Sequence, residues 1–576
     1  MNLVFDIETD DLKATKIWCI VAINDDDKVF TFGPDLIDEG VKFLNSADTL
    51  IGHNILGFDI PVIKQLTGVD LSKNKKIYDT LTLSRLFNPT REGGHSLERW
   101  GIKLNYHKKE SPDFTCYSDD MLQYCISDTK LNKILFNFLK KEGLGFTKQC
   151  LEIEHETTKI LVQQQKNGFK FDTKKATVLA SNLNKLIKQT EDEVHKTFKP
   201  RWVEDKMVTP FIKKDGTLSK RGLTEEEYIT CLKNKNFKPF MRKTLQHFNL
   251  GSRKQIGEYL QDFGWKPTKF TPTNQPIVDE TTLKDITHIH EAKLIANFLL
   301  YQKRLAQVQS WLESVEDDDR IHGSVICTGT ITGRMAHRGP NVAQVPSVKS
   351  EFGTECRSCW TVEDGYKLVG VDASGLELRM LAHYMDDERY TNEIISGDIH
   401  RTNQKLVGLE SRDKAKTFIY ALIYGAGDEK IGKIVDGDKK SGRQLKQRFL
   451  ASQPSFKHLR ERVQNASKRG YIKGLDGRKI ILRHQHAALN SLLQGGGAIV
   501  MKKALCILND KLKLVGMDYK FVANIHDEWQ IEVRACQARR VGEMAVQALV
   551  EAGDYFNLRC PLDGEYKIGV NWSETH

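Results

Sequence analysis

A short apolar run, a polar turn and then a helical spacing mark the middle of this chain. Residues 367–371 (KLVGV) have the composition of a buried strand, and residues 372–375 (DASG) have that of a turn. From Leu376 onward, apolar positions recur with a helical period. The pattern predicts a strand, a turn and a helix, with Asp372 at the end of the strand. A carboxylate in that place is costly unless it is paired or binds a metal.

A second carboxylate of this kind stands in residues 521–533 (FVANIHDEWQIEV). Two strand-like runs flank His526, Asp527 and Glu528, which predicts that these residues form the tip of a hairpin. Two strand-end aspartates brought together would repel each other. With divalent metal ions about 3.5–4 Å apart, they would instead form a site for phosphoryl transfer. We therefore expect Asp372 and Asp527 to share cations.

Four further carboxylates, a tyrosine and an asparagine are grouped in three segments near the N-terminus. The first segment predicts a strand whose alternation places its two acids on one side. The second is a glycine-punctuated stretch that leads into a helix, and the third has a tyrosine and an acid four residues apart on one helical face. In chain order the residues are Asp6 and Glu8, Asn54 and Asp59, and Tyr124 and Asp128.

This N-terminal set has two interpretations. Taken singly, acids near the ends of strands and helices are solvated or act as caps. As the ordered set D-x-E, N-x-x-x-F-D and Y-x-x-x-D, they predict a two-metal nuclease site. In that site Tyr124 would orient the attacking water.

Residues 411–426 contain a stripe of cations and aromatic rings. The stripe consists of Arg412, Lys416, Tyr420 and Tyr424, which recur every four residues. On a helix such positions drift slowly and span about 18 Å, with cations at the N-terminal end and rings at the other. A nucleoside triphosphate presents phosphates, sugar and base in the matching order. The alternative is an amphipathic helix with snorkelling cations, but its place between the two acidic motifs favours triphosphate binding.

The region between the N-terminal acids and residue 330 predicts long helices without a catalytic constellation. Residues 151–195 are largely helical with a break at 167–168, and helices are expected over 252–264 and 291–313. Loops are expected at Pro200, at Pro210 and at residues 213–216. Residues 195–247 carry thirteen Lys and Arg against six Asp and Glu. A basic helical surface of this kind is typical of proteins that hold a duplex by its phosphates, although each lysine alone could be ordinary solvated charge.

Polar residues between glycines and prolines follow in residues 329–348. Arg334, Asn341 and Gln344 can hydrogen-bond the acceptors that all base pairs share in the minor groove. The glycine-rich segments 425–432 and 494–497 resemble phosphate loops only faintly. Neither ends in G-K-[ST] after a strand, so we expect tight packing or close approach to DNA there.

Composition narrows the class of protein. Of the 576 residues, 40% are apolar and 28% are charged, with a mean hydropathy of −0.45. No run approaches 18 apolar residues and the N-terminus is acidic, so neither a transmembrane segment nor a signal peptide is expected. The net charge of +10 suits a polyanionic partner. The eleven cysteines include a single C-x-x-C pair with no zinc partner, which indicates reduced thiols in a cytosol-like compartment.

Three motifs in order resemble those of family A DNA polymerases: DASGLELR, RDKAKTFIYALIYG and HDE. The N-terminal motifs resemble the DEDDy subtype of 3′–5′ exonucleases. The combination is similar to the replicative polymerases of short-tailed bacteriophages. The resemblance implies template-directed DNA synthesis with proofreading by a 3′–5′ exonuclease.

The resemblance also implies an α/β (α+β) architecture of four parts. An RNase H-like exonuclease domain would occupy residues 1–145 and a helical thumb residues 146–310. An antiparallel-sheet palm would be split over residues 311–384 and 490–576, with helical fingers inserted at 385–489.

The resemblance further implies a role for each motif residue. The polymerase site would bind two Mg²⁺, with Mn²⁺ as a possible substitute, through Asp372, the Ala373 carbonyl and Asp527, with Glu528 secondary. The metal ligands of the exonuclease would be Asp6, Glu8, Asp59 and Asp128. The dNTP would contact His400, Arg412, Lys416, Tyr420, Glu377 and Tyr424. Primer and minor groove would face Arg334, Gln494 and His526.

Two of these roles concern selectivity. Glu377 would occupy the space of a ribose 2′-OH and so favour deoxynucleotides. Tyr420 stands where many bacterial relatives have phenylalanine, and its hydroxyl would substitute for the missing 3′-OH of a dideoxynucleotide.

The expected partners are primer–template DNA, dNTPs, a helicase–primase and a single-strand-binding protein, with no membrane contact. Thioredoxin, which phage relatives recruit through a longer thumb insertion, is not expected because the basic stretch here is short. No 5′-nuclease domain precedes Met1, so another protein would remove primers. The expected location is the cytoplasm of a bacterial host.

Two other functions remain open at this point. A single-subunit RNA polymerase would share the aspartates and the Lys/Tyr stripe, but the nuclease set and Glu377 oppose it. A non-catalytic DNA-binding scaffold would explain the positive charge but not two acidic clusters.

Overall fold

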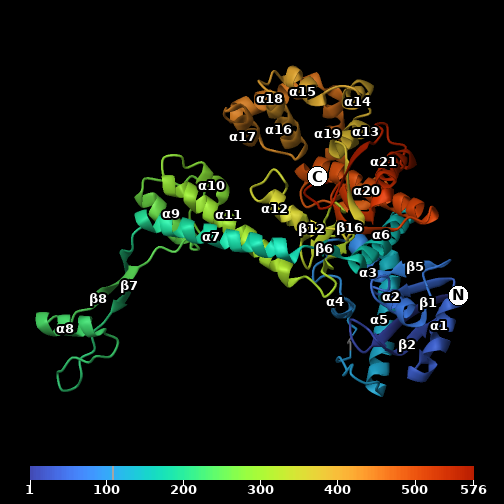
Figure 1. Ribbon diagram of the computed structural model, residues 1–576, viewed down its shortest axis with the longest axis horizontal. Helices are drawn as coiled ribbons and strands as arrows, with labels where there is room; N and C mark the ends of the chain where they lie inside the picture. Colours follow the sequence, from blue (N-terminus) through green and yellow to red (C-terminus); the bar gives the residue numbers. More distant parts are fainter. Residues whose placement is uncertain (107–108) are drawn as a thin grey trace. The chain divides into compact units, whose positions relative to one another are not determined.

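The computed structural model describes residues 1–106 and 109–576. The chain divides into two compact units, one made of Met1–Thr173 and Ser314–His576 and the other of Lys174–Glu313. Figure 1 colours the N-terminal part of the first unit blue and its C-terminal part yellow to red, and the second unit mostly green. Both units contain helices and strands, so the expectation of a mixed α/β protein is confirmed.

The first unit begins with a five-stranded sheet in the order β3-β2-β1-β4-β5. β1 pairs antiparallel with β2 and parallel with β4. Because side chains alternate along β1, Leu3, Phe5 and Ile7 join one apolar core, while Val4 joins another with helix α5. The elements are β1 (Asn2–Thr9), β2 (Ile17–Ile23), β3 (Val29–Phe32), α1 (Ile37–Asn45), β4 (Thr49–Gly52), α2 (Asp59–Thr67), β5 (Lys76–Asp79), α3 (Thr80–Phe87), α4 (Leu97–Lys103) and α5 (Asp119–Glu142).

Helix α6 follows and ends at the predicted break. Gly168 has φ +60°, and a Cβ there would lie 2.7 Å from the His322 ring, so both the backbone and the space require glycine. A short strand after this break joins a three-stranded sheet in the order β12-β6-β9. The elements are α6 (Lys148–Asn167), β6 (Phe169–Phe171), β9 (Arg320–Ile321), β10 (Ser324–Ile326), β11 (Ala336–Arg338), α12 (Gly353–Ser358) and β12 (Trp360–Thr361).

The centre of the C-terminal part is an antiparallel sheet in the order β16-β17-β13-β18. Helices α20 and α21 contact each other, and α21 also packs against β13 and β18. The predicted strand, turn and helix at 367–376 and the predicted hairpin at 521–533 are both present. The elements are β13 (Tyr366–Ala373), α13 (Leu376–Met385), α20 (Ala488–Leu514), β16 (Tyr519–Ile525), β17 (Glu528–Arg534), α21 (Ala538–Tyr555) and β18 (Gly564–Gly569).

A helical segment is inserted between α13 and α20. Ser411 caps its helix α16 through the Lys414 N–H, and α16 ends just before Tyr424, so the predicted stripe lies on one helix and its last turn. The elements are α14 (Glu388–Ile395), α15 (Ile399–Val407), α16 (Arg412–Ile423), α17 (Asp428–Gly432), α18 (Lys439–Ser452), α19 (Pro454–Ser467), β14 (Tyr471–Lys473) and β15 (Lys479–Ile481).

Buried charges join distant parts of the first unit. The Glu154 carboxylate on α6 lies 2.6 Å from both the Arg478 guanidinium and the Lys502 ammonium, and Arg478 also pairs with Asp476. Burial alone would raise the pKa of Glu154, but the two cations lower it well below its ordinary value. The cluster fixes α6 to α20 and to the β14–β15 hairpin.

One helical stretch in the described residues, Gln485–Leu514, has the length and apolar content of a membrane span. It contains α20, and 78% of its most apolar window is buried inside the protein. Its glycines explain the packing: Cβ atoms at Gly496 and Gly497 would lie 3.0 Å from Met380 and 3.1 Å from Leu376 of α13. It is therefore a core helix, and the glycine-rich segment is a site of tight packing, as expected.

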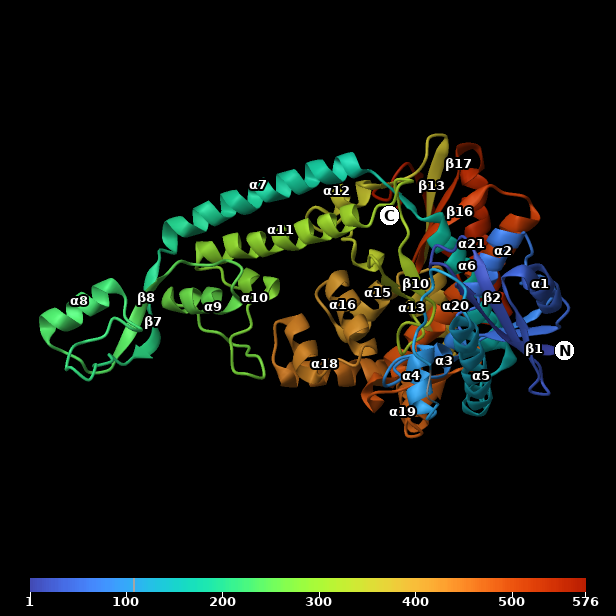
Figure 2. The same cartoon turned by 90° about the horizontal axis from the view of Figure 1, so that it is seen from below.

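The second unit has its own apolar core, which includes Phe198, Phe248, Ile256 and Ile295. Figure 2 shows an extended ribbon of two strands, β7 and β8, with α8 at its end. The elements are α7 (Thr173–Thr197), β7 (Arg201–Val208), α8 (Glu225–Asn234), β8 (Phe240–Gln246), α9 (Arg253–Asp262), α10 (Glu280–Lys284) and α11 (His290–Glu313). The helices expected at 252–264 and 291–313 are confirmed.

Pro200, Pro210 and residues 213–216 lie outside helices and strands, as expected, but the strand between the two prolines was not predicted. Strand β7 pairs antiparallel with β8. Most residues of both strands are exposed, including Trp202 at 67% and Met207 at 59%. A ribbon with two solvated faces lacks the apolar alternation by which strands are recognised in a sequence.

Candidate active sites

The two strand-end aspartates meet at one edge of the antiparallel sheet. The β13–β17 register places Asp372 opposite Glu528, and the Ala373 N–H donates to the Asp527 carbonyl at 3.0 Å. His526 has φ +57°, which allows the tight turn between β16 and β17. The hairpin therefore carries Asp527 to the end of β13, where Asp372 stands.

Burial raises the pKa of both aspartates at this edge. Asp372 is exposed as a residue, but burial of its carboxyl group, followed by the charges of Asp527 and Glu528, raises its pKa to about 7. Burial also raises the pKa of Asp527. Clustered carboxylates with raised pKa values are typical of sites that bind cations.

Glu528 differs from its two neighbours because it is already held by partners. Its Oε1 accepts from Trp572 and Gln530 at 2.6 Å, and Oε2 lies 2.8 Å from His576 Nδ1. Burial opposes ionisation, but the His576 contact lowers the pKa of Glu528 below its ordinary value. It is a fixed negative charge beside the two aspartates.

A single carboxylate links the helical segment to the Gly333–Arg334 turn. Glu377, in the first turn of α13, lies 2.9 Å from Arg334 Nη2 and accepts a hydrogen bond of 2.7 Å from the Tyr424 hydroxyl. This hydrogen bond, after burial, raises the pKa of Tyr424. Three residues that were predicted to face a nucleotide or DNA are thus in direct contact.

The α16 stripe lies beside the same acids. Tyr420 has a raised pKa because it is buried and because Glu377 and Asp527 carry negative charge nearby. The ring centroid of Tyr420 lies 6.1 Å from that of Tyr424 and 6.3 Å from that of His400. The predicted nucleotide-binding residues therefore gather on one side of the sheet edge.

The cationic end of the stripe includes a contact that the sequence did not indicate. Arg412 Nε pairs with Asp398 at 2.8 Å, and Asp398 also caps α15. Lys416 is exposed. Burial, then the charges of Arg412 and Lys416, lower the pKa of His400, which favours a neutral imidazole near these two cations.

The remaining predicted DNA contacts are less closely grouped. Gln494 lies on α20 next to Gly495, whose Cβ position would be 3.4 Å from the Thr332 carbonyl and so near the Arg334 turn. Asn341 and Gln344 are exposed at the short turn η2 (Val342–Gln344), which contacts β11 and β16.

The N-terminal acids form a second cluster. One ligand atom from each of Asp6, Glu8 and Cys125 lies within 4.8 Å of the others. Asp59 is buried at the start of α2 and accepts a 3.2 Å hydrogen bond from the Ile7 N–H, which ties it to the strand that bears the first two acids. Burial, with a contribution from Asp79, raises the pKa of Asp59 to about 7.

Tyr124 and Asp128 come to this cluster from helix α5. Tyr124 directly precedes Cys125, and Asp128 lies about one helical turn after it. Helix α5 packs against β1 and β2. Tyr124 is partly exposed and lines a cavity with Tyr106, while Asp128 is buried. The three predicted segments thus converge.

The sequence interpretation missed Asp79 and Cys125. Asp79 is buried, caps α3 and accepts hydrogen bonds from the Asn54 and Leu56 N–H groups, which holds the loop before Asp59. A capping Asp before a helical run was a usable signal for Asp79. Nothing in the spacing of Cys125 separated it from ten other cysteines.

Both acidic clusters fit divalent metal ions by their donor chemistry. Carboxylate and carbonyl oxygens are the ligands that Mg²⁺ and Mn²⁺ prefer. Burial is the main cause of the raised pKa values at Asp372, Asp527 and Asp59, and a bound cation would offset this cost of ionising the carboxylates.

The sequence profile of DNA polymerase family A matches residues 225–574, more than half of the chain. The chain belongs to DNA polymerase family A. The DNA-directed DNA polymerases of Enterobacteria phage T3 and Escherichia phage T7 are each 32% identical to this family A polymerase. The T3 protein aligns over 100% of both chains and the T7 protein over 92% of both, so the resemblance to phage polymerases is confirmed.

The fold of this family A polymerase also matches a solved structure. The polymerase domain of Pol1 from M. smegmatis, in complex with DNA primer-template and dNTP, aligns with a TM-score of 0.80 at 17% identity. The alignment covers 100% of this chain and 96% of that chain. The profile match includes both strand-end aspartates and the α16 stripe, whereas the N-terminal acids lie outside it.

Proposed function

We propose that this family A polymerase extends a DNA primer on a DNA template by two-metal phosphoryl transfer. The observation that carries the proposal is the meeting of Asp372 and Asp527 at one sheet edge beside the α16 stripe. The incoming dNTP would lie between the stripe and this edge.

The Asp372 and Asp527 carboxylates and the Ala373 carbonyl would hold two Mg²⁺ ions, with Mn²⁺ as a substitute and Glu528 as a secondary acid. Bound there, the metals would lower the pKa of the primer 3′-OH and neutralise charge on the leaving pyrophosphate. Because the fixed negative charge of Glu528 disfavours further negative charge nearby, the two aspartates would be fully ionised only when cations are bound.

The positive side chains on α15 and α16 would bind the triphosphate. Lys416 is free to approach an anion, whereas Arg412 must first exchange Asp398 for phosphate. His400, whose pKa is lowered by burial and by these two cations, would contribute a hydrogen bond from a neutral ring. Phosphates held in this way place the α-phosphorus at the acidic edge.

The tyrosines and Glu377 would select the sugar and base. Tyr424 would stack by the templating position and Glu377 would exclude a ribose 2′-OH, so both must give up their present hydrogen bond when substrate binds. Arg334, Gln494 and His526 would contact the primer end and the minor groove, which tests base-pair shape without reading sequence.

We also propose that the N-terminal cluster is a 3′–5′ proofreading exonuclease. The convergence of Asp6, Glu8, Asp59 and Asp128, with Tyr124 beside them, supports it. Two metals held by the acids would activate water, which Tyr124 would orient. Discrimination by fit alone is about 10–200-fold, so a replicative enzyme benefits from a second, hydrolytic site.

The parts of this enzyme would be an exonuclease domain (1–145), a thumb (146–310), a palm (311–384 and 490–576) and fingers (385–489). A replicative role would add a helicase–primase and a single-strand-binding protein as partners in a bacterial cytoplasm. Thioredoxin is not part of the proposal.

A primer-extension assay in Mg²⁺ tests both activities on the same labelled primer–template. We expect growth with dNTPs and shortening without them. Growth with rNTPs but not dNTPs would favour an RNA polymerase instead, and binding without either reaction would favour a scaffold.

A further inference from the structure

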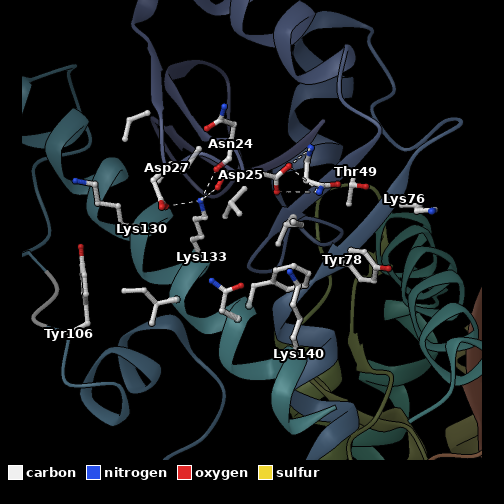
Figure 3. Close-up of a pocket in the computed structure, with 18 residues that line it drawn as sticks. Asn24, Asp25, Asp27, Thr49, Lys76, Tyr78, Tyr106, Lys130, Lys133 and Lys140 are labelled. Carbon is white, nitrogen blue, oxygen red and sulfur yellow. Dashed lines mark hydrogen bonds and ion pairs between the residues drawn. The ribbon is translucent and has the colours of Figure 1, made fainter. Parts of the chain in front are cut away.

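A cavity of about 740 Å³ lies between the N-terminal sheet and helix α5, apart from both acidic clusters. Its wall is formed by one face of β1, β4 and β5, by the β2–β3 turn and by α5 (Figure 3). The volume is within the range of small-molecule sites.

The cavity is positively charged. Four lysines line it, Lys76, Lys130, Lys133 and Lys140, against two aspartates, Asp25 and Asp27. One lysine is compensated: the Lys133 ammonium lies 2.7 Å from Asp27 and 2.6 Å from the Asn24 carbonyl.

The other charges in the cavity are unevenly matched. The Asp25 carboxylate is engaged by the Asn2 side chain at 3.2 Å. Lys76, Lys130 and Lys140 have no ion-pair partner within the part of the chain that the structure describes. Three lysines without a paired acid at the wall of one cavity favour an anionic ligand.

Aromatic rings accompany the free lysines at both ends. Figure 3 shows Tyr78 with Lys76 and Lys140 toward one end, and Tyr106 with Lys130 toward the other. The Tyr78 ring centroid lies 5.5 Å from that of Phe136, and the Lys140 ammonium lies 4.4 Å from the Phe136 centroid. Rings beside cations suit a planar base attached to a phosphate.

The cavity shares strand β1 and helix α5 with the N-terminal acidic cluster, although none of the cluster's acids lines it. Tyr106 lines both this cavity and the one that contains Tyr124. Val4, in the cavity wall, and Asp6 share one face of β1, and two residues along a strand are about 6.6 Å apart. A ligand leaving the acids would reach the lysines without crossing the sheet.

We propose that this cavity binds a nucleoside 5′-monophosphate, the chemical product of 3′–5′ hydrolysis. The identity of the natural source rests on the proposed exonuclease, but the binding chemistry does not. The phosphate would lie between Lys76 and Lys140, and the base would lie against Tyr78.

The test uses the full chain carrying Asp6→Ala and Glu8→Ala, in EDTA, so that the acidic cluster cannot bind nucleotide through metal. dAMP is titrated calorimetrically, and we expect saturable binding with one site. Lys76→Ala with Lys140→Ala should weaken binding by about 10-fold or more, since charged hydrogen bonds to phosphate are lost. Lys141→Ala, next to Lys140 on α5 but outside the cavity, should leave binding within about twofold.

Competitors define the ligand class. Displacement of dAMP by other nucleoside monophosphates, and only weakly by inorganic phosphate or deoxyadenosine alone, would support the proposal. No dAMP binding, no effect of the double lysine change, equal competition by phosphate, tighter binding of dATP, or binding of single-stranded oligonucleotide that dAMP cannot displace would each overturn it.

The two N-terminal proposals fail separately. Absent dAMP binding leaves the exonuclease assignment intact. DNA shortening that persists in the Asp6→Ala/Glu8→Ala protein would refute the exonuclease assignment without affecting the cavity.

Discussion

The two acidic clusters of this polymerase are built differently. In the Asp372–Asp527 cluster, Asp372 lies near the end of β13 and Asp527 lies in the turn before the neighbouring strand β17, with Glu528, Glu377, Arg334 and His576 around them. In the N-terminal cluster the acids come from a strand and two helices, and Cys125 is the additional neighbour. A strand pair fixes two acids by backbone register, whereas the N-terminal cluster depends on tertiary packing.

The difference extends to charge. The Asp372–Asp527 cluster combines acids with the nearby cations of α16, while the N-terminal cluster consists of acids beside a buried thiol. Synthesis needs a bound triphosphate, and hydrolysis needs only a strand end and water. We therefore predict that substitutions in one cluster abolish one activity and leave the other activity in place.

Replacing Asp372 by Asn should give the largest effect, because it removes a metal-binding charge without changing shape. We expect dNTP incorporation to fall by at least about 10⁴-fold while shortening of the primer continues. Glu565→Gln is the matched control, since Glu565 lies on β18 directly opposite Asp372 in the strand pairing. This variant should retain most activity. Synthesis that survives Asp372→Asn would place the active site elsewhere.

Replacing Asp6 and Glu8 by Ala should give the reverse pattern. Exonuclease activity on single-stranded DNA should fall by about 10³-fold or more, and primer extension should persist. Asp10→Ala, at the exposed turn after the same strand, should leave both activities unchanged. Continued editing would reject the assignment of the N-terminal acids.

The buried Asp59 predicts a pH effect on stability in the absence of divalent metal. Its folded pKa of about 7 lies above the unfolded value of 3.8, so the folded protein binds an extra proton between these values. The free energy of unfolding should therefore fall as pH rises from about 4 to about 7, by at most about 4 kcal/mol. Asp59→Asn should flatten this dependence in chemical denaturation, and Mg²⁺ should reduce it. A pH dependence that Asp59→Asn leaves unchanged would exclude this residue as the cause.

Removing the Tyr420 hydroxyl tests the proposed role of Tyr420 in sugar selection beside the Asp372–Asp527 cluster. Tyr420→Phe should raise selectivity against dideoxynucleotides by about 10-fold, the value of one hydrogen bond. The measurement is the ratio of kcat/KM for dNTP and ddNTP. Tyr424→Phe, which changes the neighbouring ring hydroxyl, is the comparison; equal ratios for Tyr420→Phe and the unsubstituted enzyme would reject the role.

The smallest expected effect concerns the Arg412–Asp398 pair. Asp398→Asn keeps the α15 cap but frees Arg412, and a solvent-exposed ion pair of this kind contributes little energy. The KM for dNTP should fall by at most about fivefold with kcat unchanged. A rise in KM would mean that Asp398 positions Arg412 for phosphate rather than competing for it.

Much of both clusters was predictable because the signals are local. Buried strands that end in Asp372 and Asp527 interrupt a polar surrounding, and the i, i+4 spacing of Tyr124 and Asp128 defines a helical face. The partners of these residues were not predictable, because Asp398 meets Arg412 and His576 meets Glu528 only through tertiary packing. The β7–β8 ribbon was missed for the opposite reason: exposed on both faces, it has no buried side to leave a pattern.

In this structure Arg334, Glu377 and Tyr424 already bind one another. The Glu377 carboxylate binds two side chains from separate segments, and both Arg334 and Tyr424 are proposed to contact DNA or nucleotide. Under the proposed function, a primer end or a nucleotide would replace these hydrogen bonds of Glu377 rather than enter an empty site. A substrate that contacts only Arg334 or only Tyr424 would leave the other side chain hydrogen-bonded to Glu377.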